Sequence, residues 1–459
     1  MLTYSGKWRY LKSDGKAIQE GPCRISFDDE QFVVTPTSGP PLAFDLGDVD
    51  VFVPGDYELT LTLYTGNKLL LNQFGAAFQN LRHDLIEAYR KRLVRCLLLE
   101  DLEEITRFDG FARLESPSGS SASPAEFRLY GSNLAVLPTS AAAWQWRLAN
   151  LESVRFDEAA WATVMKSEGE RLTVTKLAKR TEEFRQRVQG ASERVQERGA
   201  RVVRDLFPFL APDDFQQAAT AMREGRAVPV AALKAIDART EPALVANAVD
   251  ARLKPYFEAL VKNLAPGQLY AGFKMIRPDE DEDTTGQISI AESTYPTGAL
   301  DQSVEETSED EANDKPPVKQ QEEPILYWFF FPLVKVPDRR VPANLVAWES
   351  TSASGRATYL FRPVPPEQAA QLQDPRRSPT VVAEAVRQLN RAIVLLNFRR
   401  EPIYLPDESL DLQPRFHRYV IARRKIAELQ RVRDSFVGRV IHTSPEEWQK
   451  QLEGYLAQA

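Results

Sequence analysis

Two segments with nearly the same pattern decide the fold: Phe32-Val33-Val34-Thr35-Pro36-Thr37-Ser38 and Leu134-Ala135-Val136-Leu137-Pro138-Thr139-Ser140. The Pro-Thr-Ser triplet recurs at a spacing of 102 residues, together with the apolar residues before it. Further along, Gly66-Asn67-Lys68-Leu69-Leu70 corresponds to Gly169-Glu170-Arg171-Leu172-Thr173 at a spacing of 103. The chain therefore contains two copies of one structural unit.

Each copy begins with short alternating or apolar runs that Gly, Pro, Asp and Asn interrupt, which is typical of antiparallel strands joined by turns. In the first copy these runs are Cys23–Phe27, Gln31–Thr35, Leu42–Leu46, Val49–Val53, Leu59–Leu63 and Lys68–Leu71. Apolar residues then recur at three- and four-residue steps, as on one face of a helix: Phe74, Phe78, Leu81, Leu85 and Tyr89. We predict that each copy is a run of about seven antiparallel strands closed by one amphipathic helix.

This order of elements resembles the pleckstrin-homology-like (PH-like) superfold, in particular the bacterial PH and GRAM-type domains. The resemblance covers residues 6–100 and 108–200, within the segment 6–200. It rests on the strand order, the Gly66-Asn67-Lys68 turn and the terminal helix. It implies two tandem PH-like β-barrels or sandwiches that present loops to lipid headgroups, peptides or protein surfaces, and it does not imply catalysis. An unrelated small barrel or sandwich with a C-terminal helix is the alternative.

The predicted fold class is α+β. We expect a first PH-like domain at 1–102, a second with an extended C-terminal helix at 103–206, a helical connector at 207–266, and an antiparallel α+β domain at 267–459. Within the last domain, Tyr327–Phe331 is expected to be a buried central strand. Whether residues 268–398 are a third variant of the same unit stays open.

An acidic insert changes the charge balance of the chain. Residues 279–323 hold fifteen acids and two bases with one aromatic residue, so we predict a disordered loop. The whole chain has a formal net charge of −7, and the residues outside the insert carry +6. The folded body is therefore predicted to be mildly basic.

Two groups of basic residues are candidate binding sites, because phosphate and other anions need several Lys or Arg donors. The first group, around the opening strand, is a candidate anion or lipid-headgroup site: Lys7, Arg9, Lys12 and Lys16. The second group lies in the basic helical region 376–459 and is a candidate interaction face: Arg415, Arg418, Arg423, Arg424, Lys425, Arg431 and Arg433. That face could be solvated, could bind the acidic insert, or could bind an anionic partner. We do not expect nucleic acid as a partner there, because few aromatic residues are interleaved for base stacking.

Recognisable catalytic chemistry is missing from the sequence. There is no phosphate-binding glycine loop, no dinucleotide fingerprint, no zinc motif and no nucleophile elbow. Cys23 and Cys96 lie on apolar faces and are interpreted as core thiols. The three histidines, His83, His417 and His442, have no metal-ligand spacing. We therefore predict no catalytic residues, no metal and no cofactor, and a protein that is not an enzyme.

The sequence has no N-terminal signal pattern and no apolar run near the ~20 residues that a membrane span requires. We expect a cytoplasmic protein with reduced cysteines. The leading hypothesis is a non-catalytic multidomain adaptor that binds protein partners. One alternative is a peripheral protein that binds anionic lipid headgroups. The other is a polyanion binder that the acidic loop autoregulates.

Overall fold

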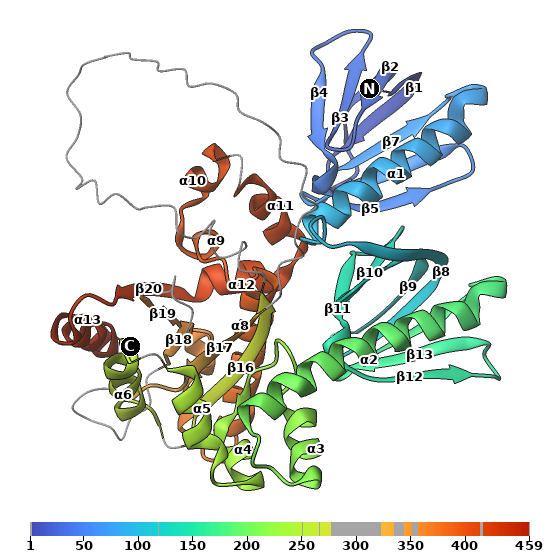
Figure 1. Ribbon diagram of the computed structural model, residues 1–459. Helices are drawn as coiled ribbons and strands as arrows, with labels where there is room; N and C mark the ends of the chain where they lie inside the picture. The colour runs from blue at the N-terminus through green and yellow to red at the C-terminus, as the bar shows by residue number, and fades with distance from the viewer. Residues whose placement is uncertain are drawn as a thin grey trace, which may run out of the picture.

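The computed structural model describes residues 2–117, 119–249, 251–265, 267–276, 323–334, 344–350, 357–413 and 416–458. The predicted acidic loop, apart from its last residue Glu323, lies outside the described residues, as does Arg415. The described residues form three antiparallel sheets with helices packed on them (Figure 1).

The first unit, residues 2–102, is a curled seven-stranded antiparallel sheet in the order β4-β3-β2-β1-β7-β6-β5. Strand β6 buries every second residue, as a half-buried strand does. Helix α1 follows the last strand and buries residues at three- and four-residue steps. The elements are β1 (Leu2–Leu11), β2 (Ala17–Phe27), β3 (Gln31–Pro36), β4 (Leu42–Asp45), η1 (Leu46–Asp48), β5 (Val49–Pro54), β6 (Glu58–Leu63), β7 (Lys68–Asn72), η2 (Gly75–Ala77) and α1 (Phe78–Cys96).

The second unit, residues 103–206, has the corresponding strand order, β11-β10-β9-β8-β14-β13-β12. Seven antiparallel strands followed by one helix are thus confirmed in both copies. The closing helix α2 is longer than α1, in agreement with the extended C-terminal helix predicted for this unit. The elements are β8 (Glu104–Ser116), β9 (Gly119–Tyr130), β10 (Asn133–Pro138), β11 (Trp144–Arg147), η3 (Leu148–Asn150), β12 (Leu151–Asp157), β13 (Ala162–Ser167), β14 (Glu170–Thr175), η4 (Ala178–Arg180) and α2 (Thr181–Leu206).

One glycine in each unit shows how closely the copies correspond. A Cβ atom on Gly6 would lie 2.7 Å from the ring of Phe74. A Cβ atom on Gly110 would lie 2.9 Å from Cδ2 of Leu177, the residue that corresponds to Phe74. The first strand of each unit therefore needs glycine where the segment before the closing helix crosses it.

The C-terminal part, residues 207–458, contains a six-stranded antiparallel sheet in the order β15-β16-β17-β18-β19-β20. This meander differs from the order shared by the first two sheets, so it is not a third copy of the repeat. The elements are α3 (Pro212–Ala221), β15 (Val228–Pro229), α4 (Val230–Ile236), α5 (Thr240–Ala248), α6 (Lys254–Lys262), β16 (Leu269–Ile276), β17 (Glu323–Phe330), β18 (Val346–Ser350), β19 (Ala357–Phe361), η5 (Pro366–Gln373), α8 (Ser378–Leu395), α9 (Glu401–Tyr404), α10 (Asp407–Leu412), α11 (His417–Lys425), α12 (Ala427–Ser435), β20 (Phe436–Ile441) and α13 (Pro445–Gln458).

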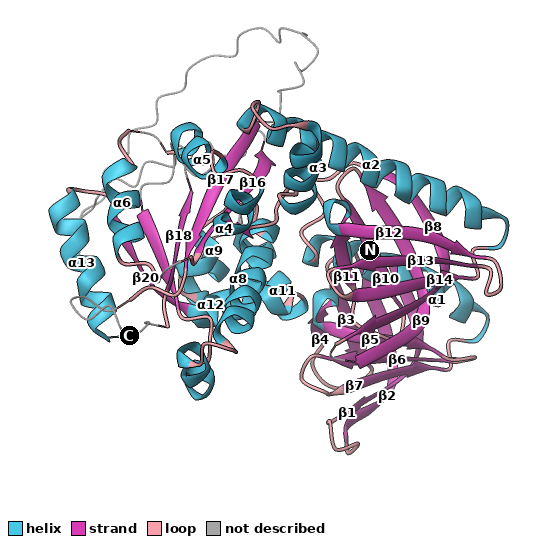
Figure 2. Cartoon of the chain, turned by 90° about the horizontal axis from the view of Figure 1, so that it is seen from below, coloured by secondary structure: helices cyan, strands magenta, loops and turns pink. Residues whose placement is uncertain are grey.

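Helices cover both faces of this third sheet (Figure 2). On one face the Tyr327 hydroxyl donates to Asn390 of α8 over 2.7 Å. On the other face Trp328 packs edge-on against Phe257 of α6. All five residues of Tyr327–Phe331 are fully buried, which confirms the predicted central strand. A strand buried on both faces has no polar side, which is why its sequence is continuously apolar.

No helix among the described residues is both long and apolar enough to cross a membrane.

Candidate functional site

The four bases of the first predicted group lie on the β1–β2 hairpin, and all four are exposed. Arg9 forms an ion pair with Glu20 at 3.0 Å, and Lys16 lies 3.8 Å from Asp14. The hairpin therefore presents cations together with two acids. Exposed ion pairs of this kind contribute little to stability.

Most of the second predicted group faces inward. From α11, Arg418 pairs with Glu100 and Asp101 of the first unit at 2.9 and 2.8 Å. Arg424 pairs with Asp48 and lies over the ring of Tyr64. These two bases hold α11 against the first unit.

Lys425 completes this contact. Its ammonium group donates to Asp50 at 2.7 Å and to the backbone carbonyl of Val49 at 2.6 Å. The Lys425 side chain is only 8% exposed, so its charge depends on these partners rather than on water. The start of β5 is thereby in contact with the C-terminal part.

Two of the three remaining described bases of this group hold the C-terminal helices together. Arg423 and Arg433 both pair with Asp407. The hydrogen bond from Arg423 lowers the pKa of that carboxyl group below its usual value. Arg431 is exposed beside a groove lined by η5, α8 and α12. Five of the six described members of the predicted basic face therefore form ion pairs within the chain.

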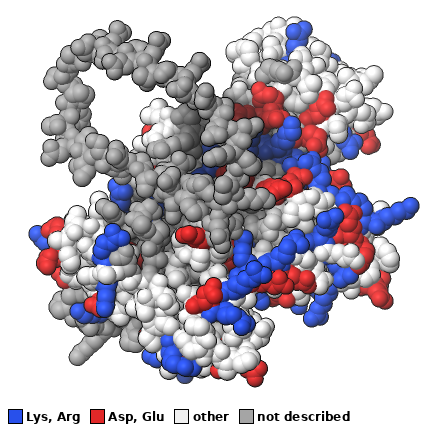
Figure 3. Space-filling model, in the orientation of Figure 1, with Lys and Arg blue, Asp and Glu red and all other residues white. Residues whose placement is uncertain are grey.

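The first and second units meet through backbone and charged contacts. The N–H of Phe52, on the edge strand β5, donates to the carbonyl of Thr139 at 3.1 Å. Arg90 of α1 pairs with Glu126 at 3.0 Å and lies 3.6 Å from Asp109. Figure 3 shows acidic and basic side chains lying next to one another on this face of the molecule.

The second unit meets the C-terminal part through buried ion pairs. The side chain of Glu224 is 3% exposed and lies between Arg147 and Arg198, at 3.4 and 2.7 Å. Arg391 of α8 donates from Nε to Glu168 over 2.7 Å. Buried charges are costly unless paired, so these contacts fix how the parts are placed.

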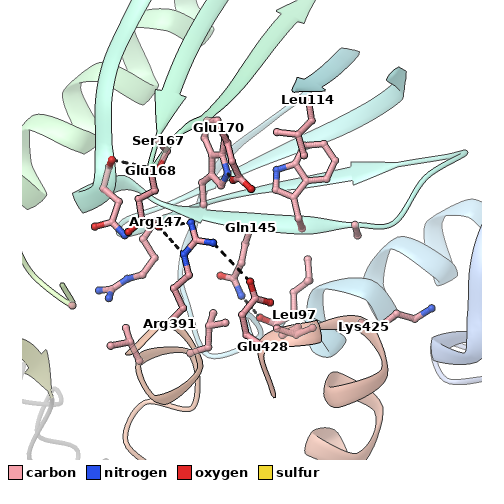
Figure 4. A pocket seen from close by; sticks show the side chains of 18 residues that line it. Leu97, Leu114, Gln145, Arg147, Ser167, Glu168, Glu170, Arg391, Lys425 and Glu428 are labelled. Carbon is pink, nitrogen blue, oxygen red and sulfur yellow. Dashed lines mark hydrogen bonds and ion pairs between the residues drawn. The ribbon is translucent and has the colours of Figure 1, made fainter. Parts of the chain in front are cut away.

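A small cavity of about 170 Å³ lies where all three parts meet (Figure 4). Three buried polar atoms along its lining have no partner among the described residues: Nε1 of Trp144, Nη1 of Arg147 and Oδ1 of Asn150. The charged groups beside them already form ion pairs with one another, for example Arg391 with Glu168. The cavity has polar groups in its lining and is large enough to hold ordered water, and we interpret it as a hydrated interface.

The edge strands β5 and β12 correspond to one another in the two units, and each has a β-bulge near its start. A bulge lies between Val49 and Val51 in β5, and another between Leu151 and Ser153 in β12. The carbonyl at the start of each bulge accepts two side-chain donors: Tyr89 and Lys425 at Val49, and Gln196 and Arg223 at Leu151. At each bulge, the carbonyl thus binds one side chain from the unit's own closing helix and one from the C-terminal part.

Beyond the bulge, β12 leads to an exposed aromatic residue that the sequence did not single out. Trp161 is 62% exposed and has a φ of +48°, which is unfavourable for a bulky residue. Phe156 packs edge-on against it, with ring centroids 5.2 Å apart. Strained, exposed residues of this kind are concentrated at functional sites. The only feature of the sequence that could have indicated this site is a tryptophan in a turn.

Neither the two cysteines nor His442 forms a recognisable nucleophile–base pair within the described residues. Cys23 and Cys96 are buried as predicted, and burial raises their thiol pKa values to about 11 and about 12. In a buried network, Nε2 of His442 lies 3.0 Å from Oγ1 of Thr358 and 3.2 Å from Glu349. A triad needs the acid and the nucleophile on opposite ring nitrogens, whereas both contacts here use the same one. Within the described ranges, no group of three or more acidic, His or Cys side chains could hold a metal ion.

Comparison with known proteins adds little. No family model matches the chain, and no curated protein matches it. Among solved structures, the pleckstrin homology (PH) domain of USP37 matches with 20% sequence identity, over 20% of this chain and 98% of that chain, with a TM-score of 0.16. A TM-score this low does not identify the fold or the function of this chain.

Proposed function

We propose that this chain is a non-catalytic cytoplasmic adaptor that binds protein partners, with two PH-like units held in a fixed orientation. The observation that carries the proposal is the open edge of the second sheet, strand β12 with Trp161 beside it. Strand edges present unpaired backbone groups that can add a strand or loop from another chain. The corresponding edge strand of the first sheet, β5, already binds a loop in this way, because the N–H of Phe52 donates to the Thr139 carbonyl of the second unit.

Site-specific photo-cross-linking in the native cell tests this proposal. A benzophenone amino acid replaces Trp161 in the full chain, and the matched control places it at Tyr57, an exposed aromatic residue at the corresponding turn of the first unit. We expect a discrete protein adduct at position 161 that is absent at position 57. Val154→Pro, which removes one backbone donor from the edge strand, should abolish the adduct while far-UV circular dichroism stays unchanged. No adduct at 161, or the same adducts at both positions, would refute the proposal.

A second candidate function rests on the exposed bases of the β1–β2 hairpin. Lys7, Arg9, Lys12 and Lys16 would bind anionic lipid headgroups. Co-sedimentation with phosphatidylserine vesicles at low salt tests this, with phosphatidylcholine vesicles as the lipid control. Changing Lys7 and Lys12 to Glu should abolish binding, and Lys450→Glu on α13 is the matched control. Absence of binding by the unaltered chain removes this function.

The polyanion-binding alternative has less support. It requires a free basic face, whereas five described bases of that face are paired within the chain. Deleting residues 279–323 should raise heparin affinity if the insert covers that face. An unchanged affinity rules the alternative out.

A further inference from the structure

The contact between the two units pairs a Pro-Thr-Ser loop with an edge strand, and the loop exists twice. In the second unit, the Thr139 N–H donates to the Pro124 carbonyl over 3.0 Å, and the Thr139 carbonyl accepts from Phe52. In the first unit, the Thr37 N–H donates to the Pro22 carbonyl over 3.1 Å. The two loops therefore have the same internal hydrogen bond at residues 102 apart.

The first-unit loop is exposed. Thr37 and Ser38 are both solvent-accessible. Among the described residues, no backbone or side-chain donor outside the first sheet reaches the Thr37 carbonyl. The first unit thus exposes the Thr37 carbonyl on its surface, whereas the corresponding Thr139 carbonyl of the second unit is used in the contact between the two units.

The edge strand also exists twice. Val154 in β12 pairs with Met165 as Phe52 in β5 pairs with Leu61, each three residues beyond the start of the same bulge. Because the N–H of Phe52 faces away from its sheet, the N–H of Val154 faces away from the second sheet. In the part of the chain that the structure describes, no acceptor outside the second sheet binds the N–H of Val154. Figure 1 shows β12 on the side of the second unit that faces away from the first.

A side chain from the C-terminal part that binds at the bulge does not block this edge. On β5, Lys425 binds the Val49 carbonyl while the Thr139 loop binds Phe52. On β12, Arg223 binds the Leu151 carbonyl at the same position of the bulge. The first unit therefore shows that a side chain at the bulge and a loop three residues further on fit together.

An opposite-charge pair is also available at both edges. Between the units, Arg90 of α1 pairs with Glu126 of β9. The corresponding positions are Glu193 on α2 and Arg24 on β2, and both are exposed. The signs are reversed at both positions, so attraction between a second-unit helix and a first-unit strand is preserved.

We propose that copies of this chain associate head to tail, with the Pro36–Ser38 loop of one copy bound to β12 of the next and Glu193 paired with Arg24. The inference rests on the proposed function, because the binding edge is β12 in both proposals. It adds that the partner is a second copy of this chain. A contact between two different surfaces leaves one of each surface open at the ends of the assembly. The association is weaker than the internal contact, because Thr35 replaces the buried Leu137 at the corresponding position of the docking strand.

Sedimentation velocity on the purified full chain tests this inference over a series of concentrations. The unaltered chain should show a sedimentation coefficient that rises with concentration. Glu193→Lys alone and Arg24→Glu alone place like charges in contact, so each should shift association to more than roughly tenfold higher concentration. An equimolar mixture of the two variants restores an opposite-charge pair at every contact and should associate like the unaltered chain. Lys450→Glu is the control and should change nothing.

A monomer at every concentration would overturn the inference. Association that both single variants leave unchanged would overturn it too, as would failure of the mixture to restore it. The proposed function is tested separately. If the chain stays monomeric while position 161 still cross-links to a different protein, self-association is wrong and the adaptor function stands. If neither occurs, both are wrong.

Discussion

Replacing Lys425 by Met should loosen the first unit from the C-terminal part without unfolding either. The Lys425 ammonium group is the most buried cation of α11, and it makes two hydrogen bonds to β5. Methionine keeps most of the apolar length of the side chain, so packing is largely retained and the charge is lost.

The expected cost follows from those contacts. A hydrogen bond that involves a charged group contributes about 1.5–3 kcal/mol. The Asp50 side chain is 43% exposed, so water stabilises it after the change and the loss falls in the lower half of that range. The Val49 carbonyl keeps its hydrogen bond from Tyr89, so we count the Asp50 bond alone and expect the contact between α11 and β5 to lose about 2 kcal/mol. At about 1.4 kcal/mol per factor of ten, this is about 30-fold more frequent opening.

Hydrogen–deuterium exchange with mass spectrometry reports this opening locally. Peptides that contain β5 and α11 should exchange about 30-fold faster in Lys425→Met, while peptides from the third sheet keep their rates. Lys7→Met removes an exposed cation from β1 and should change stability by less than about 0.5 kcal/mol. Equal exchange in the two variants would refute the view that Lys425 attaches α11 to the first unit.

Three further outcomes are expected. Glu224→Gln removes the buried carboxylate beside Arg147, whose side chain is 14% exposed, and should destabilise the chain by about 3 kcal/mol, measured by urea unfolding. Trp161→Gly relieves an unfavourable φ and loses one ring contact, so the free energy of unfolding, measured by thermal denaturation, should change by less than about 1 kcal/mol. Because the folded-state pKa of Asp407 is lowered, its stabilising effect is present above its unfolded pKa of about 3.9 and is lost as pH falls through the folded value. Asp407→Asn should therefore reduce the acid sensitivity of unfolding below about pH 4, and an identical pH profile would contradict this.

The sequence predicted those features that nearby residues determine. Strand alternation and the Pro-Thr-Ser repeat gave the two seven-stranded sheets, because side-chain period and turn chemistry are local properties. The apolar run at Tyr327–Phe331 correctly predicted a strand buried on both faces. The buried positions of Cys23 and Cys96 followed from the same patterning.

The interfaces could not be predicted in this way. Lys425 and Asp50 are 375 residues apart, and nothing in either local pattern indicates that they meet. A basic helix that binds its own chain has the same composition as one that binds an external anion. The unfavourable φ of Trp161 depends on the geometry of a turn rather than on its residue types.

Amide hydrogen exchange at Phe52 and Val154, measured by NMR in the same dilute sample, tests most directly whether β12 is the open counterpart of β5. We predict slow exchange at Phe52, whose N–H is bonded to the Thr139 carbonyl, and fast exchange at Val154. Exchange at Val154 should slow as the protein is concentrated or a partner is added. Equal protection at the two positions in dilute solution, or exchange at Val154 that no binding event changes, would contradict the account.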